Sequence, residues 1–405
     1  MKAKVLFVDD DPMVLAGFKA MFHLRRKEFQ AAFALSGEEG LLLLDSADFD
    51  VIVADMRMPG MNGADFLAEA ARRAPTALRV ILSGYSEMDV VLRSVKPAHQ
   101  FLSKPCKPDV LFGTITRILR LRHILTNEAV QQVVGRIESL PALPELYLKI
   151  QQALTSPDPS LKTIGALVGQ DMGMSASVLK VVNSSFFGFY NKIISPAHAV
   201  NLLGVEVMKG LVLGIQFIKR FDLDLLPGYS LHKVWGHCLQ TGTFARALAR
   251  REGKDDDFAD ACFIAGLLHD VGKLVLASEM PDDYRLVLHD VKNEGGGTHR
   301  FELARLGVSH QQIGAYLLGL WGMSMAIVEA VYAHHEPALA GPGVTPGLLV
   351  HVADRLQHEL IVYDPGYVFA PLDADWIETQ GLAHRVDAWR ETCKTLLTEH
   401  PHGQA

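Results

Sequence analysis

The stretch "KVLFVDDDP" (residues 4–12) begins with an apolar, β-branched run and ends in three consecutive aspartates. An apolar run of this length, bounded by polar residues, is typical of a buried strand. Similar runs follow at residues 31–35, 50–55, 79–84 and 100–105, and segments of helical periodicity separate them. This alternation predicts an α/β fold with a five-stranded, doubly wound parallel sheet that helices cover on both faces.

Polar side chains follow four of the five predicted strands. Asp9 and Asp10 follow the first strand, Asp55 the third, Ser83 the fourth and Lys104 the fifth. The carboxyl ends of parallel strands share one edge of a sheet, so these groups should converge. A lone aspartate would more often cap a helix, but clustered carboxylates favour a bound Mg²⁺. One carboxylate is then free to attack a phosphoryl group whose oxygens Ser83 and Lys104 hold.

Residues 1–122 resemble a two-component receiver domain, which has the flavodoxin-like fold. The segments that carry the resemblance are "VDDDP", "DMRMPGMNG", "LSG" and "KP". The resemblance implies that a sensor histidine kinase phosphorylates Asp55. It also implies that Asp9, Asp10 and Asp55 bind Mg²⁺ together with the backbone carbonyl of Arg57.

The same resemblance assigns the residues that respond to phosphorylation. Ser83 takes the position of the switch hydroxyl and Phe101 that of the switch aromatic residue, which is more commonly tyrosine. Lys104 is the lysine that contacts the phosphoryl group, and the peptide bond to Pro105 is the one that these domains usually keep in cis.

Residues 106–150 have helical periodicity until "LPALP" (140–144) interrupts it. We therefore expect the last receiver helix to continue as a helical linker over residues 123–139. From residue 140 the periodicity stays helical without an alternating strand pattern, which predicts an all-α region. A C-terminal extension over residues 356–400 reads as one or two amphipathic helices that close this region.

Two segments, "DMGMSASVLKVVNSSFFG" (171–188) and "ISPAHAVNLLG" (194–204), resemble an HDOD domain. HDOD domains are helical output modules related to HD-type phosphohydrolases, and the resemblance covers residues 140–355. It implies an output by interaction with a downstream protein. The chain would thus be a response regulator of a two-component phosphorelay.

The stretch "IAGLLHDVGKLVL" (264–276) places a His-Asp pair inside an apolar run that reads as a buried helix. An isolated histidine on an apolar face is more often a hydrogen-bonded core residue than a ligand. Here, however, the spacing along the chain lets several histidines and aspartates converge in one bundle core and enclose divalent ions. The candidate metal ligands are His237, His269, Asp270, His310, His334, His335 and Asp354.

These seven residues match, one by one, the ligand series of the HD-GYP cyclic di-GMP phosphodiesterases. The resemblance implies Fe, Mn or another divalent transition metal, with Lys273 as a contact to substrate phosphate and Glu302 as a partner that orients His310. The Gly-Tyr-Pro signature is missing after "HHE" (334–336), which counts against an enzyme. Three alternatives remain: a metal-dependent cyclic dinucleotide phosphodiesterase, a non-catalytic metal-binding module, and a structural polar cluster.

Composition limits the remaining choices. A chain of 405 residues is long enough for two or three domains. The net charge of −7 and the lack of a basic block argue against direct nucleic-acid binding. We see no signal peptide and no apolar run of about 20 residues, so we expect a cytoplasmic protein without a membrane span. The four scattered cysteines indicate reduced thiols. A homodimer could form through the faces of the receiver domain or through the helical linker.

Overall fold

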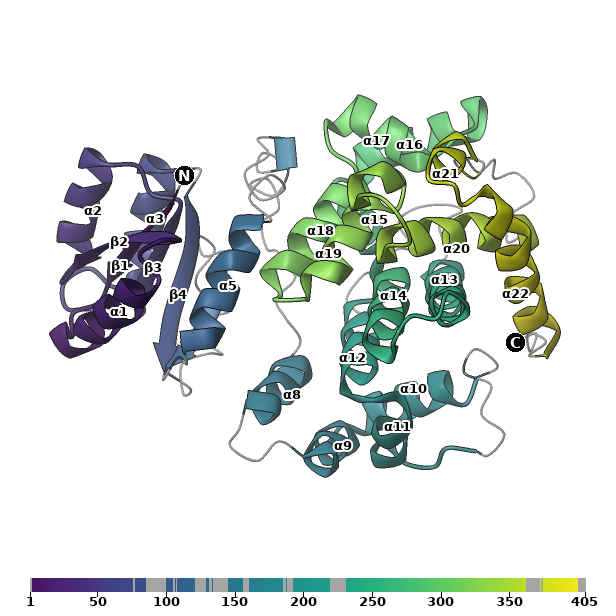
Figure 1. The fold of residues 1–405 in the computed structure, drawn as a ribbon, viewed down its shortest axis with the longest axis horizontal. Helices are drawn as coiled ribbons and strands as arrows, with labels where there is room; N and C mark the ends of the chain where they lie inside the picture. Colours follow the sequence, from purple (N-terminus) through teal and green to yellow (C-terminus); the bar gives the residue numbers. More distant parts are fainter. Residues whose placement is uncertain are drawn as a thin grey trace. The chain divides into compact units, whose positions relative to one another are not determined.

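The structure is a computed structural model, and it falls into two compact units. One comprises Met1–Ala142 with Gly319–Gly322, and the other comprises Leu143–Leu318 with Met323–Ala405. Each unit is described by itself (Figure 1). The residues that the structure describes are 2–75, 77–84, 100–104, 106, 108–120, 129–130, 133, 145–155, 160–184, 187, 192–218, 231–361, 372 and 374–399.

The N-terminal unit contains the predicted parallel sheet. Its strands are β1 (Ala3–Val8), β2 (Phe29–Ala34), β3 (Val51–Asp55), β4 (Leu78–Gly84) and β5 (Gln100–Lys104), in the order β2-β1-β3-β4-β5. All four neighbouring pairs are parallel. The helices are α1 (Pro12–Leu24), α2 (Gly37–Ser46), α3 (Gly63–Arg73) and α5 (Pro108–Arg120). The doubly wound α/β fold is confirmed.

Alternate residues of β1 point to opposite faces of the sheet and build two cores. Leu6 and Val8 pack with apolar side chains of α2 and α3. Phe7 points to the other face, where its ring lies 4.8 Å from that of Phe18 in α1. Phe112 of α5 belongs to the same aromatic core. Burial on both faces explains why the strand runs are almost continuously apolar.

The second unit is all-α over the described residues, as predicted (Figure 1). Its helices are α8 (Glu145–Thr155), α9 (Leu161–Gln170), α10 (Met172–Val182), α11 (Pro196–Leu203), α12 (Val205–Ile218), α13 (Leu231–Arg251), α14 (Asp256–Leu268), α15 (Val271–Glu279), α16 (Pro281–Glu294), α17 (Thr298–Leu306), α18 (His310–Leu320), α19 (Met325–Ala333), α20 (Pro346–Leu360), α21 (Ala374–Thr379) and α22 (Val386–Glu399).

Helix α14 lies at the centre of this bundle, where it packs against α12, α13, α19 and α20. The expected single helix over residues 264–276 is wrong, because α14 ends at Leu268 and α15 begins at Val271. The stretch Asp256–Glu279 is long and apolar enough to cross a membrane by length and composition, contrary to our sequence expectation. However, 94% of its most apolar window is buried inside the bundle, as in a core helix.

The predicted C-terminal helices are confirmed as α21 and α22. Helix α22 packs against α13 and α20, and the buried indole of Trp389 donates a hydrogen bond to Glu252 (2.7 Å). The helical linker stays a prediction, because residues 121–128 and 134–144 lie outside the described residues. Pro105 also lies outside them.

Candidate phosphorylation and metal sites

The carboxyl edge of the sheet gathers the five polar groups that the sequence places there. Carboxylate oxygens of Asp9, Asp10 and Asp55 lie within 4.8 Å of one another. The Nζ atom of Lys104 lies 2.7 Å from Asp9 Oδ2 and also forms an ion pair with Asp55. Ser83 is buried at the same edge, with 1% of its surface exposed. Three carboxylates with a lysine among them fit a hard, oxygen-binding cation such as Mg²⁺.

Backbone groups hold Asp55 in place. The Arg57 amide donates to Asp55 Oδ2 at 2.9 Å. Burial raises the pKa of the Asp55 carboxyl, and hydrogen bonding to Lys104 only partly offsets this effect. Gly63 starts α3 directly beside the Asp55 carbonyl, where a side chain would collide with the backbone. This packing explains the last glycine of "DMRMPGMNG". Phe101 pairs with Ile81 in the sheet, and its side chain lies outside the described residues.

The seven candidate ligands of the helical unit come from six helices or their ends. His237 lies in α13 and Asp354 in α20. His269 and Asp270 occupy the break between α14 and α15. His310 begins α18, and the pair His334 and His335 follows α19.

The structure brings all seven together around Asp270, in two groups. The first, which we call the α13 cluster, consists of His237, His269 and Asp354: His237 Nε2 lies 3.0 Å from His269 Nε2 and 3.3 Å from Asp354 Oδ1. The second, the α18 cluster, consists of His310, His334 and His335: His310 Nε2 lies 3.2 Å from His334 Nε2 and 2.9 Å from His335 Nε2. Asp270 Oδ1 lies 3.4 Å from Nε2 of both His269 and His310, between the two clusters.

Four of the histidines point the same ring nitrogen inward. Their Nδ1 atoms each face an acceptor outside the centre, which fixes the Nδ1–H tautomer and leaves the Nε2 lone pair free to bind a metal. His269 donates to the Gly266 carbonyl and His334 to the Val331 carbonyl. His310 donates to the Glu302 carboxylate and His237 to the Gln357 side-chain oxygen. All four distances are 2.6–2.7 Å. The predicted contact between Glu302 and His310 is thus confirmed.

The donor set fits two divalent ions that share Asp270. The buried Asp270 Oδ1 atom has no hydrogen-bond partner among the described residues. Two ligands in adjacent octahedral positions, each about 2.1 Å from an ion, are about 3 Å apart. The Nε2 separations of 3.0 Å between His237 and His269 and 3.2 Å between His310 and His334 agree with that distance. Imidazole and carboxylate donors favour a first-row transition metal.

Electrostatics keep these donors in the state that binds metals. Burial lowers the pKa of His269 to about 4 and that of His334 well below its usual range. Burial alone would raise the pKa of Asp270, but His269 and Lys273 hold it well below its usual range. Arg355 and His237 likewise lower the pKa of the buried Asp354 carboxyl. His269 and His334 are therefore neutral and both carboxylates ionised at neutral pH, whereas contacts with Asp354 and Asp270 outweigh burial and raise the pKa of His237.

The depressed histidine pKa values predict acid sensitivity of the metal-free protein. The pKa of His269 is about 4 when folded and 6.5 in its ordinary state, so below pH 6.5 the unfolded chain binds a proton that the folded chain does not. The contribution of His269 to stability is therefore complete above pH 6.5 and decreases by about 3 kcal/mol towards pH 4. Urea unfolding in EDTA across this range should show the decrease.

The matched comparison uses two single variants. His269→Gln should flatten the pH dependence of the unfolding free energy, whereas replacement of the exposed His289 by alanine should leave it unchanged. Equal slopes for all three proteins would contradict the assigned role of His269 burial.

Gly272 explains why the His-Asp pair is followed by "VG". A side chain at this position would collide with the His310 carbonyl and the Gly314 amide. Without one, the start of α15 packs directly against the start of α18. This close approach brings Asp270 next to His310, because both lie within two residues of the contact.

The structure adds residues that the sequence reasoning missed. His358 lies one helical turn after Asp354, with Nε2 3.5 Å from Asp354 Oδ1 and its ring stacked on His237. His299 stacks on His335 with 4.3 Å between ring centroids. The i, i+4 spacing of Asp354 and His358 was a signal available in the sequence. Lys273, the predicted phosphate contact, donates to Asp270 Oδ2 at 2.8 Å.

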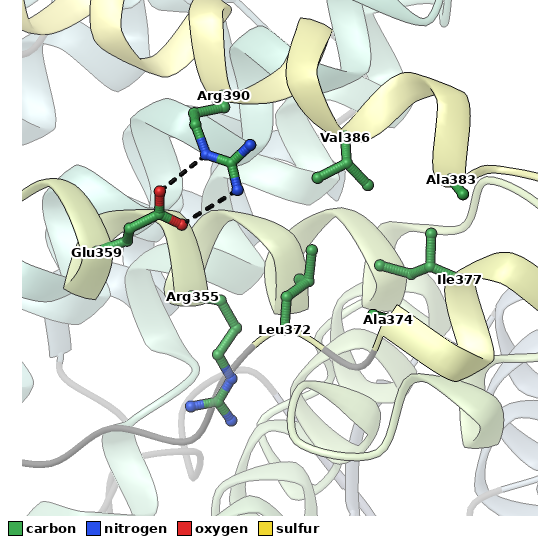
Figure 2. Close-up of a pocket in the computed structure, with 8 residues that line it drawn as sticks. All are labelled: Arg355, Glu359, Leu372, Ala374, Ile377, Ala383, Val386 and Arg390. Carbon is green, nitrogen blue, oxygen red and sulfur yellow. Dashed lines mark hydrogen bonds and ion pairs between the residues drawn. The ribbon is translucent and has the colours of Figure 1, made fainter.

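Helix α20 also borders a cavity of about 330 Å³ next to the C-terminal helices. Figure 2 shows that Glu359 pairs with Arg390 across it, whereas Arg355 extends away from that pair. The lining residues are Arg355, Glu359, Leu372, Ala374, Ile377, Ala383, Val386 and Arg390.

Both units match known domain families. Residues 5–116 match the response regulator receiver domain and residues 140–337 match the HDOD domain. The chain thus carries a receiver domain followed by an HDOD domain. This is the architecture of a response regulator with an HDOD output domain.

The chain spans less than two thirds of the length of the curated relatives that it matches. An uncharacterized protein of Treponema pallidum is 29% identical over 231 residues, which are 55% of this chain and 44% of that protein. The nitrate/nitrite response regulator NarL of Escherichia coli is 33% identical over 33% of this chain and 62% of its own length. A crystal structure of an HDOD domain protein from Geobacter sulfurreducens has the same fold over 67% of this chain and 92% of its own, with a TM-score of 0.52 and 20% identity.

Proposed function

We propose that this protein is a cytoplasmic response regulator that a sensor histidine kinase phosphorylates on Asp55. The observation that carries the proposal is the placement of Asp55 beside Lys104 and Asp9 at the carboxyl edge of the sheet. Asp9, Asp10, Asp55 and the Arg57 carbonyl would hold Mg²⁺, which neutralises phosphoryl oxygens. The Asp55 carboxylate would attack the phosphorus of the kinase's phosphohistidine, so that an O–P bond forms as the N–P bond breaks and the imidazole leaves, while Lys104 and Ser83 stabilise the transferred group.

We further propose that the HDOD domain holds Fe or Mn in the centre that Asp270 forms with the two clusters, and that it signals through regulated interaction with a downstream protein. The support is the burial of the donors: His269, His310 and His334 have no exposed surface. Structural metal sites are closed, whereas catalytic sites keep an open position for substrate. Phosphorylation would reach this domain through the helical linker.

Hydrolysis of cyclic di-GMP is the second candidate. It is favoured by Lys273, whose ammonium lies at Asp270 with 12% of its side chain exposed. Bound metals would supply Lewis acidity and an activated water, and Lys273 would bind a phosphate oxygen. The missing Gly-Tyr-Pro segment argues against this candidate.

One assay separates the two candidates. The full chain, loaded with Mn²⁺ or Fe²⁺ and either phosphorylated or not, is incubated with cyclic di-GMP, and the products are separated by chromatography. We expect no linear dinucleotide above the level given by His269→Ala, Asp270→Ala. Turnover that this double variant abolishes would establish the phosphodiesterase in place of the interaction module.

A further inference from the structure

His335 differs from the other histidines of the centre in what faces its Nδ1 atom. The Nδ1 atoms of the other four face oxygen acceptors. The Nδ1 atom of His335 instead faces the guanidinium of Arg355, with Nη2 at 2.8 Å. A guanidinium can only donate hydrogen bonds, so this Nδ1 atom must accept. The proton of the neutral His335 ring therefore lies on Nε2, the atom that points into the centre.

The neighbouring contact supports the same tautomer. His335 Nε2 lies 2.9 Å from His310 Nε2. Glu302 accepts from the His310 Nδ1 atom, so His310 Nε2 is a lone pair and can only accept. His335 thus donates Nε2–H to His310, and both ends of its ring are satisfied without a metal. In this state His335 offers no lone pair to an ion.

The position of Arg355 is fixed by the fold. Its side chain is buried, and it follows Asp354 directly in α20, with Nη1 3.7 Å from Asp354 Oδ2. The carboxylate of Glu359, which would be the natural partner on the same helix, is bound to Arg390 (Figure 2). The Arg355 charge is consequently directed towards the metal centre.

We propose that Arg355 holds His335 in its non-ligating tautomer and so limits the centre to one tightly bound divalent ion. This inference rests on the proposed metal centre. The ion would lie at the α13 cluster and Asp270, where four donors are available. A second ion at the α18 cluster would need the His335 proton to move to Nδ1. Two N–H donors, from His335 and Arg355, would then face each other.

The test counts metal ions in the full chain and three variants. Wild type, Arg355→Met, His335→Ala and the double variant are loaded with Mn²⁺. They are then passed through gel filtration in excess Mg²⁺, which occupies the receiver site, and analysed for manganese. We expect one ion per chain in wild type and in His335→Ala, and two in Arg355→Met. The double variant should return to one ion, because the gained ion needs the His335 lone pair.

The outcomes separate this inference from the proposed metal centre. Two ions in wild type would overturn the role of Arg355 and leave the metal centre intact. No ion in folded wild type would overturn both. One ion in folded Arg355→Met would also overturn the inference. Nitrogen-15 NMR of metal-free wild type, with His335→Ala for assignment, tests the tautomer without the Arg355 variant: a proton on Nδ1 would refute it.

Discussion

Replacement of Asp270 by asparagine is expected to remove the transition metal from the HDOD domain almost completely. Asp270 Oδ1 lies 3.4 Å from histidine nitrogens of both clusters, so it is the donor that the two metal positions share. Even groups that only orient a ligand contribute about 10- to 100-fold to metal affinity. We therefore expect a loss of more than about 100-fold for Asp270→Asn. Titration of the metal-free full chain with Mn²⁺ in a Mg²⁺ buffer measures this loss.

The matched control is Asp260→Asn. Asp260 belongs to the same bundle and, like Asp270, is ion-paired, but it is only partly buried and its partner is Arg246. This control should lose stability and keep its metal affinity, whereas Asp270→Asn should lose affinity. Circular dichroism shows whether each variant is folded. Unchanged affinity in folded Asp270→Asn would refute the shared-ligand role.

The receiver site could be predicted almost entirely from the sequence. These strands are short apolar runs, and a functional carboxylate ends the run or follows it directly, as Asp55 ends β3 and Asp9 follows β1. Parallel pairing then dictates that these groups meet at one edge. Local sequence and the parallel pairing of the strands are therefore sufficient to place these groups.

The HD centre could be predicted only in part. The seven donors have recognisable spacing, but the break between α14 and α15 is invisible to periodicity because the His-Asp pair lies in a continuous apolar run. The ring tautomers depend on partners far away in the chain, such as Gln357 for His237. The contact of Arg355 with His335 likewise depends on how α20 packs beside the end of α19.

Replacement of Asp55 by asparagine is expected to abolish phosphorylation of the chain. The asparagine amide has nearly the same shape but is not a nucleophile, so transfer from acetyl phosphate in Mg²⁺ should decrease by at least about a thousandfold. Intact-mass spectrometry of the full chain measures the phosphorylated fraction. Asp48→Asn, an exposed aspartate of the same domain, is the control and should be phosphorylated like wild type.

The fold should survive this change because of how Lys104 is shared. In wild type its ammonium contacts both Asp9 and Asp55, and these contacts raise the pKa of Lys104 although burial lowers it. In Asp55→Asn the contact with Asp9 remains, so the lysine keeps a carboxylate partner. The variant therefore removes the nucleophilic carboxylate and leaves the ion pair between Lys104 and Asp9 in place. Phosphorylation of folded Asp55→Asn at the wild-type level would show that another residue accepts the phosphoryl group.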